Sequence, residues 1–123
     1  MSLKELTKAE EAVMKQVWHL QKATVKEIAA LMPDPKPAYT TVATVLKVLK
    51  DKGFVEAGSA GNVLTYFPLV KEDDYRRFAF DKVFSTYFDG SYENLVSFLV
   101  EEKRLDEGAY QRLLEAAKKL KKK

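Results

Sequence analysis

The sequence contains no cysteine and only one histidine among its 123 residues. Without cysteine the chain has no disulfide framework, no thiolate nucleophile and no cysteine-based metal site. His19 has no cysteine partner for nucleophilic work, and the scattered acidic residues show no recurring metal-ligand spacing. We therefore expect no catalytic residues, no metal site and no cofactor, and we expect that the protein is not an enzyme.

Long apolar runs are also missing from the chain. No stretch approaches the roughly 20 apolar residues of a membrane helix, and the first five residues lack the apolar region of a signal peptide. We therefore expect a cytoplasmic protein without a membrane partner. The net charge is only +3, so basicity alone does not establish nucleic-acid binding.

Two capping boxes indicate the first two helices. Thr7 with Glu10, and Thr24 with Glu27, have the spacing at which the two side chains accept hydrogen bonds from the otherwise unpaired amides of a helix start. The first helix should run to about Gln21, and the second should follow Thr24. The three prolines at positions 33, 35 and 37 then exclude helix, because proline lacks an amide donor.

A third helix is predicted from about Tyr39 to Gly53. Its apolar stripe has the i, i+3, i+4, i+7 spacing of a core face and consists of Val42, Val45, Leu46 and Leu49. The opposite face is polar. Its outward residues are Thr40, Thr44 and Lys47, with Thr41 and Val48 on the flank. A short, hydroxyl-rich face of this kind suits a DNA groove.

The rest of the chain completes the predicted fold. Residues 54–57 and 63–67 have the composition of strands, and the glycines of the 58–62 segment permit the turn of a hairpin. Helical spacing returns from about residue 71. We predict a mainly α fold with a small antiparallel β wing: a winged helix-turn-helix domain over residues 1–70, followed by a helical domain over residues 71–123.

The sequence around the third helix resembles the penicillinase-repressor family of bacterial transcription regulators, the BlaI/MecI type. The resemblance lies in Tyr39-Thr40-Thr41-Val42-Ala43-Thr44-Val45-Leu46, continued by Leu49, Lys52 and Gly53-Phe54-Val55. The opening helix adds Leu6-Thr7-Lys8-Ala9-Glu10, Val13-Met14 and Val17-Trp18. Val48 departs from the family, because relatives often have arginine there. The chain also lacks the C-terminal cysteine metal motif of the copper-responsive relatives.

The resemblance implies a repressor that binds a double-stranded DNA operator. Threonines can contact base edges, whereas lysines, a tyrosine and a helix start suit phosphates. The residues expected to contact DNA are Thr24, Lys26, Lys36, Tyr39, Thr40, Thr41, Thr44, Lys47, Lys50 and Asn62. Asn62 should contribute weakly, because the wing tip has no basic residue. The alternative is that the threonines merely fill a solvated face and that each lysine only improves solubility.

The C-terminal half has more apolar side chains than one small helical lobe needs to cover. The resemblance implies that this half forms a two-fold homodimer on a palindromic operator. The residues expected at the dimer interface are Phe78, Val83, Phe84, Tyr87, Leu95, Leu99, Leu113 and Leu114. The alternative is that these side chains close an intramolecular core.

Family members are regulated by a protease that cuts an Asn-Phe bond in the dimerisation domain, downstream of a membrane sensor of β-lactams. The corresponding bond here is Ser97-Phe98. The resemblance implies a regulatory protease as a partner. Because serine replaces asparagine at this bond, the resemblance does not imply the same protease specificity or a β-lactam signal.

The leading hypothesis is therefore a homodimeric DNA-binding transcriptional repressor whose repression is relieved by proteolysis. The alternative is a winged-helix protein-interaction module without sequence-specific DNA binding. The outward face of the third helix discriminates between them, because a docking surface would favour large exposed apolar side chains over threonine and lysine.

Overall fold

The computed structural model describes residues 3–102 and 106–121. The elements, in chain order, are α1 (Lys8–Leu20), α2 (Val25–Leu31), α3 (Tyr39–Asp51), β1 (Val55–Ala60), β2 (Val63–Pro68), α4 (Glu72–Phe88), α5 (Tyr92–Glu101) and α6 (Glu107–Lys121). Contacts divide the chain after Ala79 into two compact units, which are described separately.

Both predicted capping boxes are present. The Thr7 hydroxyl accepts a hydrogen bond from the Glu10 amide, and the Glu10 carboxylate accepts one from the Thr7 amide. Thr24 and Glu27 repeat this arrangement at the start of α2. The two boxes satisfy amides that would otherwise lack partners, and they explain why these helices begin where the sequence predicts.

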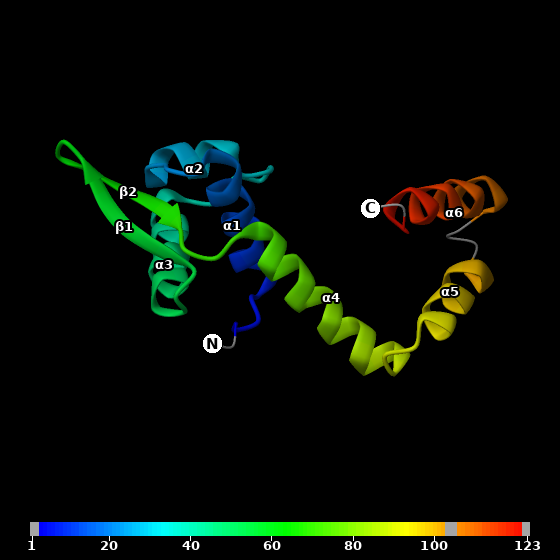
Figure 1. Ribbon diagram of the computed structural model, residues 1–123. Helices are drawn as coiled ribbons and strands as arrows, with labels where there is room; N and C mark the ends of the chain where they lie inside the picture. The colour runs from blue at the N-terminus through cyan, green and yellow to red at the C-terminus, as the bar shows by residue number, and fades with distance from the viewer. Residues whose placement is uncertain (1–2, 103–105, 122–123) are drawn as a thin grey trace. The chain divides into compact units, whose positions relative to one another are not determined.

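The core of the first unit lies between α1, α2, α3 and the base of the hairpin (Figure 1). The largest side chains that are completely buried there are Met14, Ile28, Leu46, Leu49 and Phe54. They come from all three helices and from the residue before β1. The first unit is thus a winged helix, and its predicted fold class is confirmed.

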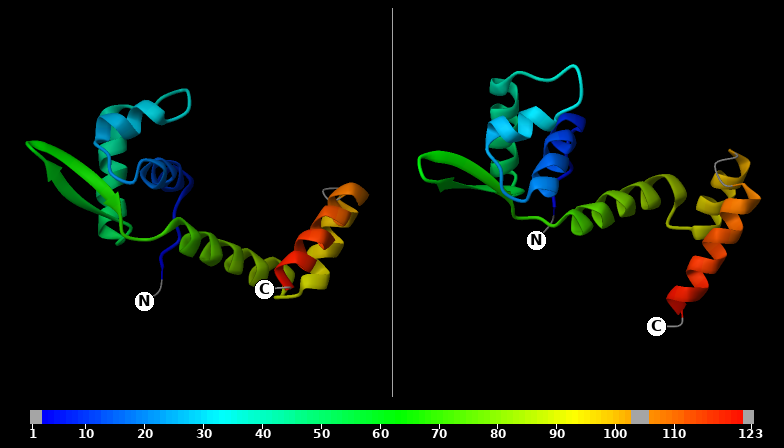
Figure 2. Two further views of the ribbon diagram at one scale, coloured as in Figure 1. Left: turned by 45° about the horizontal axis from the view of Figure 1, so that its top comes forward. Right: turned by 90° about the horizontal axis from the view of Figure 1, so that it is seen from above.

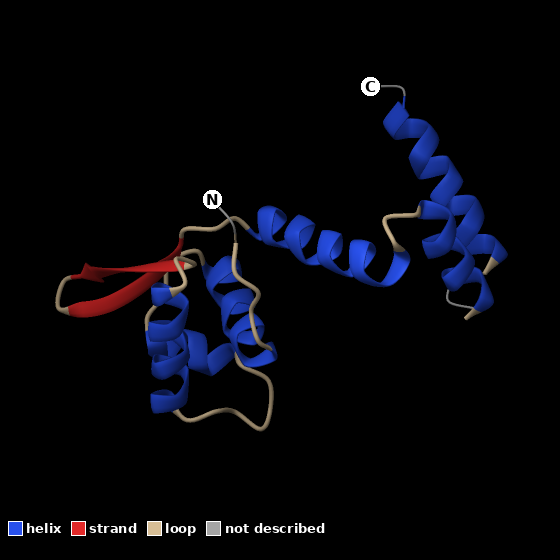
Figure 3. Ribbon diagram, turned by 90° about the horizontal axis from the view of Figure 1, so that it is seen from below, coloured by secondary structure: helices blue, strands red, loops and turns tan. Residues whose placement is uncertain are grey.

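The hairpin is longer than the sequence predicts. β1 and β2 are antiparallel, and Ala60 pairs with Val63, so the turn contains only Gly61 and Asn62. The predicted 58–62 loop is therefore wrong, because Gly58 and the two residues after it continue the strand. Gly61 has a φ of +65°, which glycine adopts without the steric cost of a side chain. Figures 2 and 3 show the hairpin extending away from the three helices.

Ala23 forms an isolated antiparallel bridge with Tyr66 at the base of this hairpin. Its amide donates to the Tyr66 carbonyl over 3.0 Å, and the Tyr66 amide donates to the Ala23 carbonyl over 2.8 Å. The link between α1 and α2 is therefore fixed to β2 by backbone hydrogen bonds.

The first unit continues into α4, beyond the boundary expected at residue 70. Tyr75 is buried in the winged-helix core, where its ring centroid lies 5.5 Å from that of Phe54. The ring of Phe78 packs against Tyr75 at 5.7 Å. Phe78, which the sequence assigns to a dimer interface, is thus half-buried inside the first unit. The boundary moves because the first turns of α4 supply core side chains.

The second unit contains the rest of α4 together with α5 and α6. Its rings form three pairs: Phe80 with Phe84, Phe84 with Tyr92, and Phe88 with Phe98. No residue of α5 is buried. The intramolecular contacts therefore leave much of the apolar surface of this unit exposed to solvent.

None of the described helices is both long enough and apolar enough to cross a membrane. Within residues 3–102 and 106–121, no three His, Asp or Glu side chains gather where they could hold a metal ion.

Candidate nucleic-acid interface

The third helix has one buried face and one exposed face, as its sequence predicts. Val42, Leu46 and Leu49 are buried, each with at most 1% of its surface exposed. The polar residues on the other side are all exposed: Thr40, Thr41, Thr44 and Lys47. The structure therefore brings together on one surface the three threonines expected to contact bases and Lys47, which is expected to reach a phosphate.

The start of α3 is open to solvent. Ala38, the N-cap residue, makes no side-chain hydrogen bond to the first turn. Tyr39 is the first helical residue, and 58% of its surface is exposed. The amides at a helix start carry partial positive charge, so at an uncapped and exposed start they can donate hydrogen bonds to a phosphate oxygen.

Thr44 lies at the centre of the exposed face. Its hydroxyl donates a hydrogen bond to the Thr40 carbonyl over 2.9 Å. The only hydroxyl proton of Thr44 is thereby engaged inside the helix. What remains available to an outside molecule is the oxygen as an acceptor and the methyl group as an apolar contact.

The lysines near α3 differ in their partners. In the part of the chain described by the structure, no hydrogen bond or ion pair engages the Lys47 ammonium. The Lys50 ammonium lies 3.7 Å from the Glu56 carboxylate at the start of the wing. Lys47 therefore presents its full charge to solvent, whereas Glu56 partly neutralises Lys50.

Lys36 is already engaged within the first unit. Its ammonium donates to the carbonyl oxygens of Ala30 (2.7 Å) and Met32 (2.9 Å) at the end of α2. These carbonyls lack partners within the helix, so the lysine caps the negative end of the helix. A phosphate contact by Lys36 would have to compete with these two hydrogen bonds.

The other expected contacts lie at two separate places. Thr24 and Lys26 are at the start of α2, where the Thr24 hydroxyl already serves the capping box and Lys26 is exposed. Asn62 is exposed in the turn of the wing. Beside it on β2, Val63 and Leu64 each expose 51% of their surface. The tip of the wing is thus uncharged and partly apolar.

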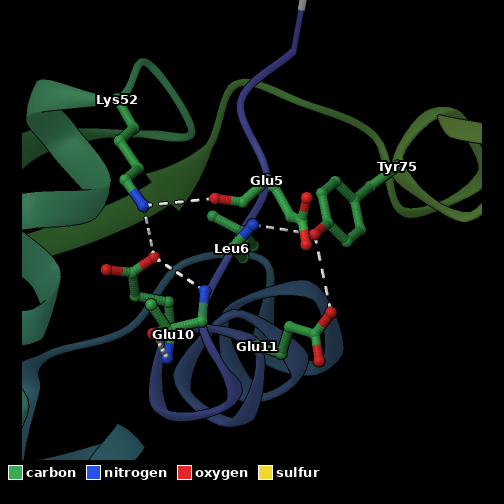
Figure 4. A network of polar contacts seen from close by, with 7 residues as sticks. Glu5, Leu6, Glu10, Glu11, Lys52 and Tyr75 are labelled. Carbon is green, nitrogen blue, oxygen red and sulfur yellow. Dashed lines mark hydrogen bonds and ion pairs between the residues drawn. The ribbon is translucent and has the colours of Figure 1, made fainter. Parts of the chain in front are cut away.

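A network of polar contacts fixes α3 and α4 to α1 (Figure 4). The Lys52 ammonium lies 2.6 Å from the Glu10 carboxylate and 3.3 Å from the Glu5 carbonyl oxygen. The Tyr75 hydroxyl accepts a hydrogen bond from the Leu6 amide at 3.0 Å. Burial raises the pKa of Tyr75, so its hydroxyl stays neutral at physiological pH.

The pKa of Glu10 reflects two opposing effects. Burial raises the pKa of the carboxyl group, but hydrogen bonds from Lys52 and Thr7 and the positive charge of Lys52 together lower it. The net pKa lies below the ordinary value. Glu10 is therefore a carboxylate at neutral pH and holds the end of α3 through its charge.

Most residues expected at a dimer interface lie together in the second unit. A groove of about 610 Å³ is lined by Val83, Tyr87, Phe88, Leu95, Phe98 and Leu99. Phe84 packs between Phe80 and Tyr92. Leu113 and Leu114 are exposed on α6.

Ser97 and Phe98, the expected cleavage position, lie within α5 and are both exposed.

Glu10, Glu56 and Tyr75 also position this surface, although their roles were not predicted from the sequence. Glu10 was expected only as part of a capping box. Lys52 is 42 residues away from it, and no local pattern connects the two. The contact between Glu56 and Lys50 could have been predicted, because a strand that follows a helix closely brings its first side chains near the end of that helix.

Comparison with known proteins identifies relatives. The family model described as penicillinase repressor matches residues 6–119. The solution structure of the DNA-binding domain of the repressor BlaI has a TM-score of 0.52 and 27% identity, and the match covers 60% of this chain and 92% of that one. For the CopR repressor structure the TM-score is 0.47 and the identity 32%, over 55% of this chain and 100% of that one. A comparison with curated proteins gives no match. On the strength of the family model, which spans nearly its whole length, the chain belongs to the penicillinase repressor family.

Proposed function

We propose that this protein is a DNA-binding transcriptional repressor that acts as a homodimer on a palindromic operator. The observation that carries the proposal is the exposed face of α3, where three threonines and Lys47 lie together beside an uncapped helix start. Threonine side chains are short enough to reach base edges, and lysine can reach a phosphate. Such a repressor occupies promoter DNA in the cytoplasm.

The matched family and the solved BlaI domain support this function, because both are described as repressors. The BlaI domain that resembles this chain is described as DNA-binding. Its match covers about the length of the first unit, which contains the exposed face of α3.

The exposed apolar surface of the second unit supports the homodimer. Tyr87 and Tyr92 expose 76% and 70% of their surfaces, and Val83 exposes 46%. Burying such side chains against a second copy would remove apolar area from water, which is the main source of stability in protein association. A two-fold dimer would place two α3 helices about 34 Å apart, one turn of DNA.

The oligomeric state has a direct test. Sedimentation at micromolar concentration should give a dimer, and Val83→Asp should shift it to monomer because the charge would enter an apolar interface. Val63→Asp, on the exposed hairpin of the first unit, is the matched control and should remain dimeric. A monomeric wild-type protein would contradict the homodimer.

Relief of repression by cleavage between Ser97 and Phe98 is part of the proposal. Both side chains are exposed, but the bond lies within α5, and the Phe98 ring packs on Phe88 at 5.5 Å. A protease needs an extended segment, so α5 must open locally before cleavage. Mass spectrometry of the chain from induced cells should find a fragment that ends at Ser97; an intact chain during induction would exclude this mode of relief.

A second candidate function is that of a protein-docking module. The exposed Val63 and Leu64 on the wing favour it, because apolar side chains grouped at a hairpin tip suit a protein surface better than a phosphate backbone. The exposed face of α3 argues against it, because that face is mostly hydroxyl and ammonium groups.

Selection of bound duplexes from random DNA distinguishes the two functions. A dimeric repressor should enrich an inverted repeat whose half-site centres are about ten base pairs apart. Thr44→Ala should still bind DNA but should alter the preferred bases in each half-site. Failure to enrich any sequence would contradict the repressor and leave the docking module as the better account.

A further inference from the structure

Val48 is an apolar residue on the otherwise polar face of α3. The residue exposes 37% of its surface, and it is not part of the buried core formed by Val42, Leu46 and Leu49. At about 100° per residue, Thr41, Thr44 and Val48 lie within a stripe about 60° wide. The apolar side chain therefore shares the surface that is proposed to face DNA.

The chemistry of this stripe favours one kind of base pair. Thr44 has donated its only hydroxyl proton to the Thr40 carbonyl, so it offers an acceptor to a base edge. Val48 offers only methyl groups. In the major groove an A·T pair presents both a donor, the adenine amino group, and the apolar 5-methyl group of thymine, whereas a G·C pair has a donor but no methyl group.

We propose that Val48 is a specificity-determining residue that packs on the 5-methyl group of a thymine in each half-site. The inference rests on the proposed function, because it requires that the exposed face of α3 enters the major groove. The distance along the helix axis from Thr41 to Val48 is about 10 Å, which is close to the rise of three base pairs. The thymine read by Val48 therefore lies within about three base pairs of the base read by Thr41.

The test uses a duplex selected from random DNA and replaces each thymine in turn with deoxyuridine, which lacks only the 5-methyl group. Replacement of a single thymine, the one that Val48 contacts in either half-site, should weaken binding of the wild-type protein about fourfold, the change that corresponds to losing one buried methyl group, about 0.8 kcal/mol. Replacements at thymines that do not contact the protein should have no effect.

Two variants connect the effect to Val48. Val48→Ala should bind the thymine and deoxyuridine duplexes equally at that position; alanine favours helix, so the fold should persist. Val63→Ala, which shortens an equally simple exposed side chain on the wing, should retain the fourfold difference. The circular dichroism spectrum and melting temperature of both variants should match the wild type.

The other outcomes overturn the inference. If no deoxyuridine replacement weakens binding, or if Val48→Ala retains the same sensitivity, Val48 does not read a thymine methyl group, although the protein still binds DNA. If the wild-type protein binds no duplex at all, the proposed function fails and the inference fails with it.

Discussion

The Glu10 carboxylate of α1 and the Lys52 ammonium at the end of α3 lie 2.6 Å apart, and their side chains are only 11% and 22% exposed. Lys52 also donates to the Glu5 carbonyl oxygen. Because α3 carries the threonines and lysine proposed to contact DNA, this ion pair holds the end of that helix on the body of the first unit.

Replacing Lys52 with methionine should lower the free energy of unfolding by about 2 kcal/mol. The change removes a hydrogen bond between charged groups and leaves the Glu10 carboxylate largely buried without its counter-charge. Urea denaturation at pH 7 measures the loss. Lys15→Met, in the exposed middle of α1, is the control and should change the free energy by less than about 0.5 kcal/mol. Equal losses in the two variants would contradict a role for the ion pair.

The contribution of Glu10 to the free energy of unfolding should decrease as the pH falls. Its pKa is lower in the folded protein than the ordinary value of 4.5, so folding favours the carboxylate and the unfolded state binds the proton more readily. The stability advantage of the wild type over Glu10→Gln should therefore be constant from pH 7 to about pH 5.5. It should then shrink as the pH falls below about 4.5 and through the folded-state pKa. Urea titrations at successive pH values test this, and an advantage that grows towards pH 3 would show the opposite sign.

Tyr75→Phe should destabilise the first unit by about 1 to 2 kcal/mol. The variant retains the ring that packs on Phe54, but it leaves the buried Leu6 amide without its acceptor. Exchange of the Leu6 amide hydrogen with solvent should become faster. Tyr92→Phe, whose side chain is mostly exposed in the second unit, should leave both quantities unchanged. Unaltered protection of Leu6 in Tyr75→Phe would show that the hydroxyl is not its essential partner.

Local chemistry explains why much of the fold could be predicted from the sequence. The two capping boxes involve residues only three positions apart, and the stripe of α3 repeats within a few turns. These features predicted α1, α2, α3 and the exposed face of α3. The length of the hairpin could not be predicted, because the pairing of Ala60 with Val63 depends on the strands and not on the glycines of the turn.

The relations that position the candidate site are between residues far apart in the sequence. Lys52 meets Glu10, and Tyr75 meets Leu6 across 69 positions. The side chain of Lys36 could not be placed from composition either, since a lysine that caps a helix end and one that meets a phosphate look alike in sequence. Packing also places Phe78 against Tyr75 in the first unit, where it is half-buried.

Glu56→Gln should strengthen DNA binding. The Glu56 carboxylate lies near the Lys50 ammonium and partly neutralises it, so its removal should let Lys50 contact a phosphate. Affinity should rise severalfold at low salt, and the dependence of log K on log salt concentration should become steeper by about one unit. Glu107→Gln removes the same charge from α6 in the second unit and should have a smaller effect. If both variants bind alike, the gain reflects only net charge and not Lys50.

The most direct test of the account measures how Lys47→Ala binds a selected operator over a range of salt concentrations, with Lys15→Ala of α1 as the control. If the exposed face of α3 lies on DNA, Lys47→Ala should bind more weakly and its salt dependence should fall by about one unit, whereas Lys15→Ala should match the wild type. Binding by Lys47→Ala with the affinity and salt dependence of the wild type would contradict the proposed interface.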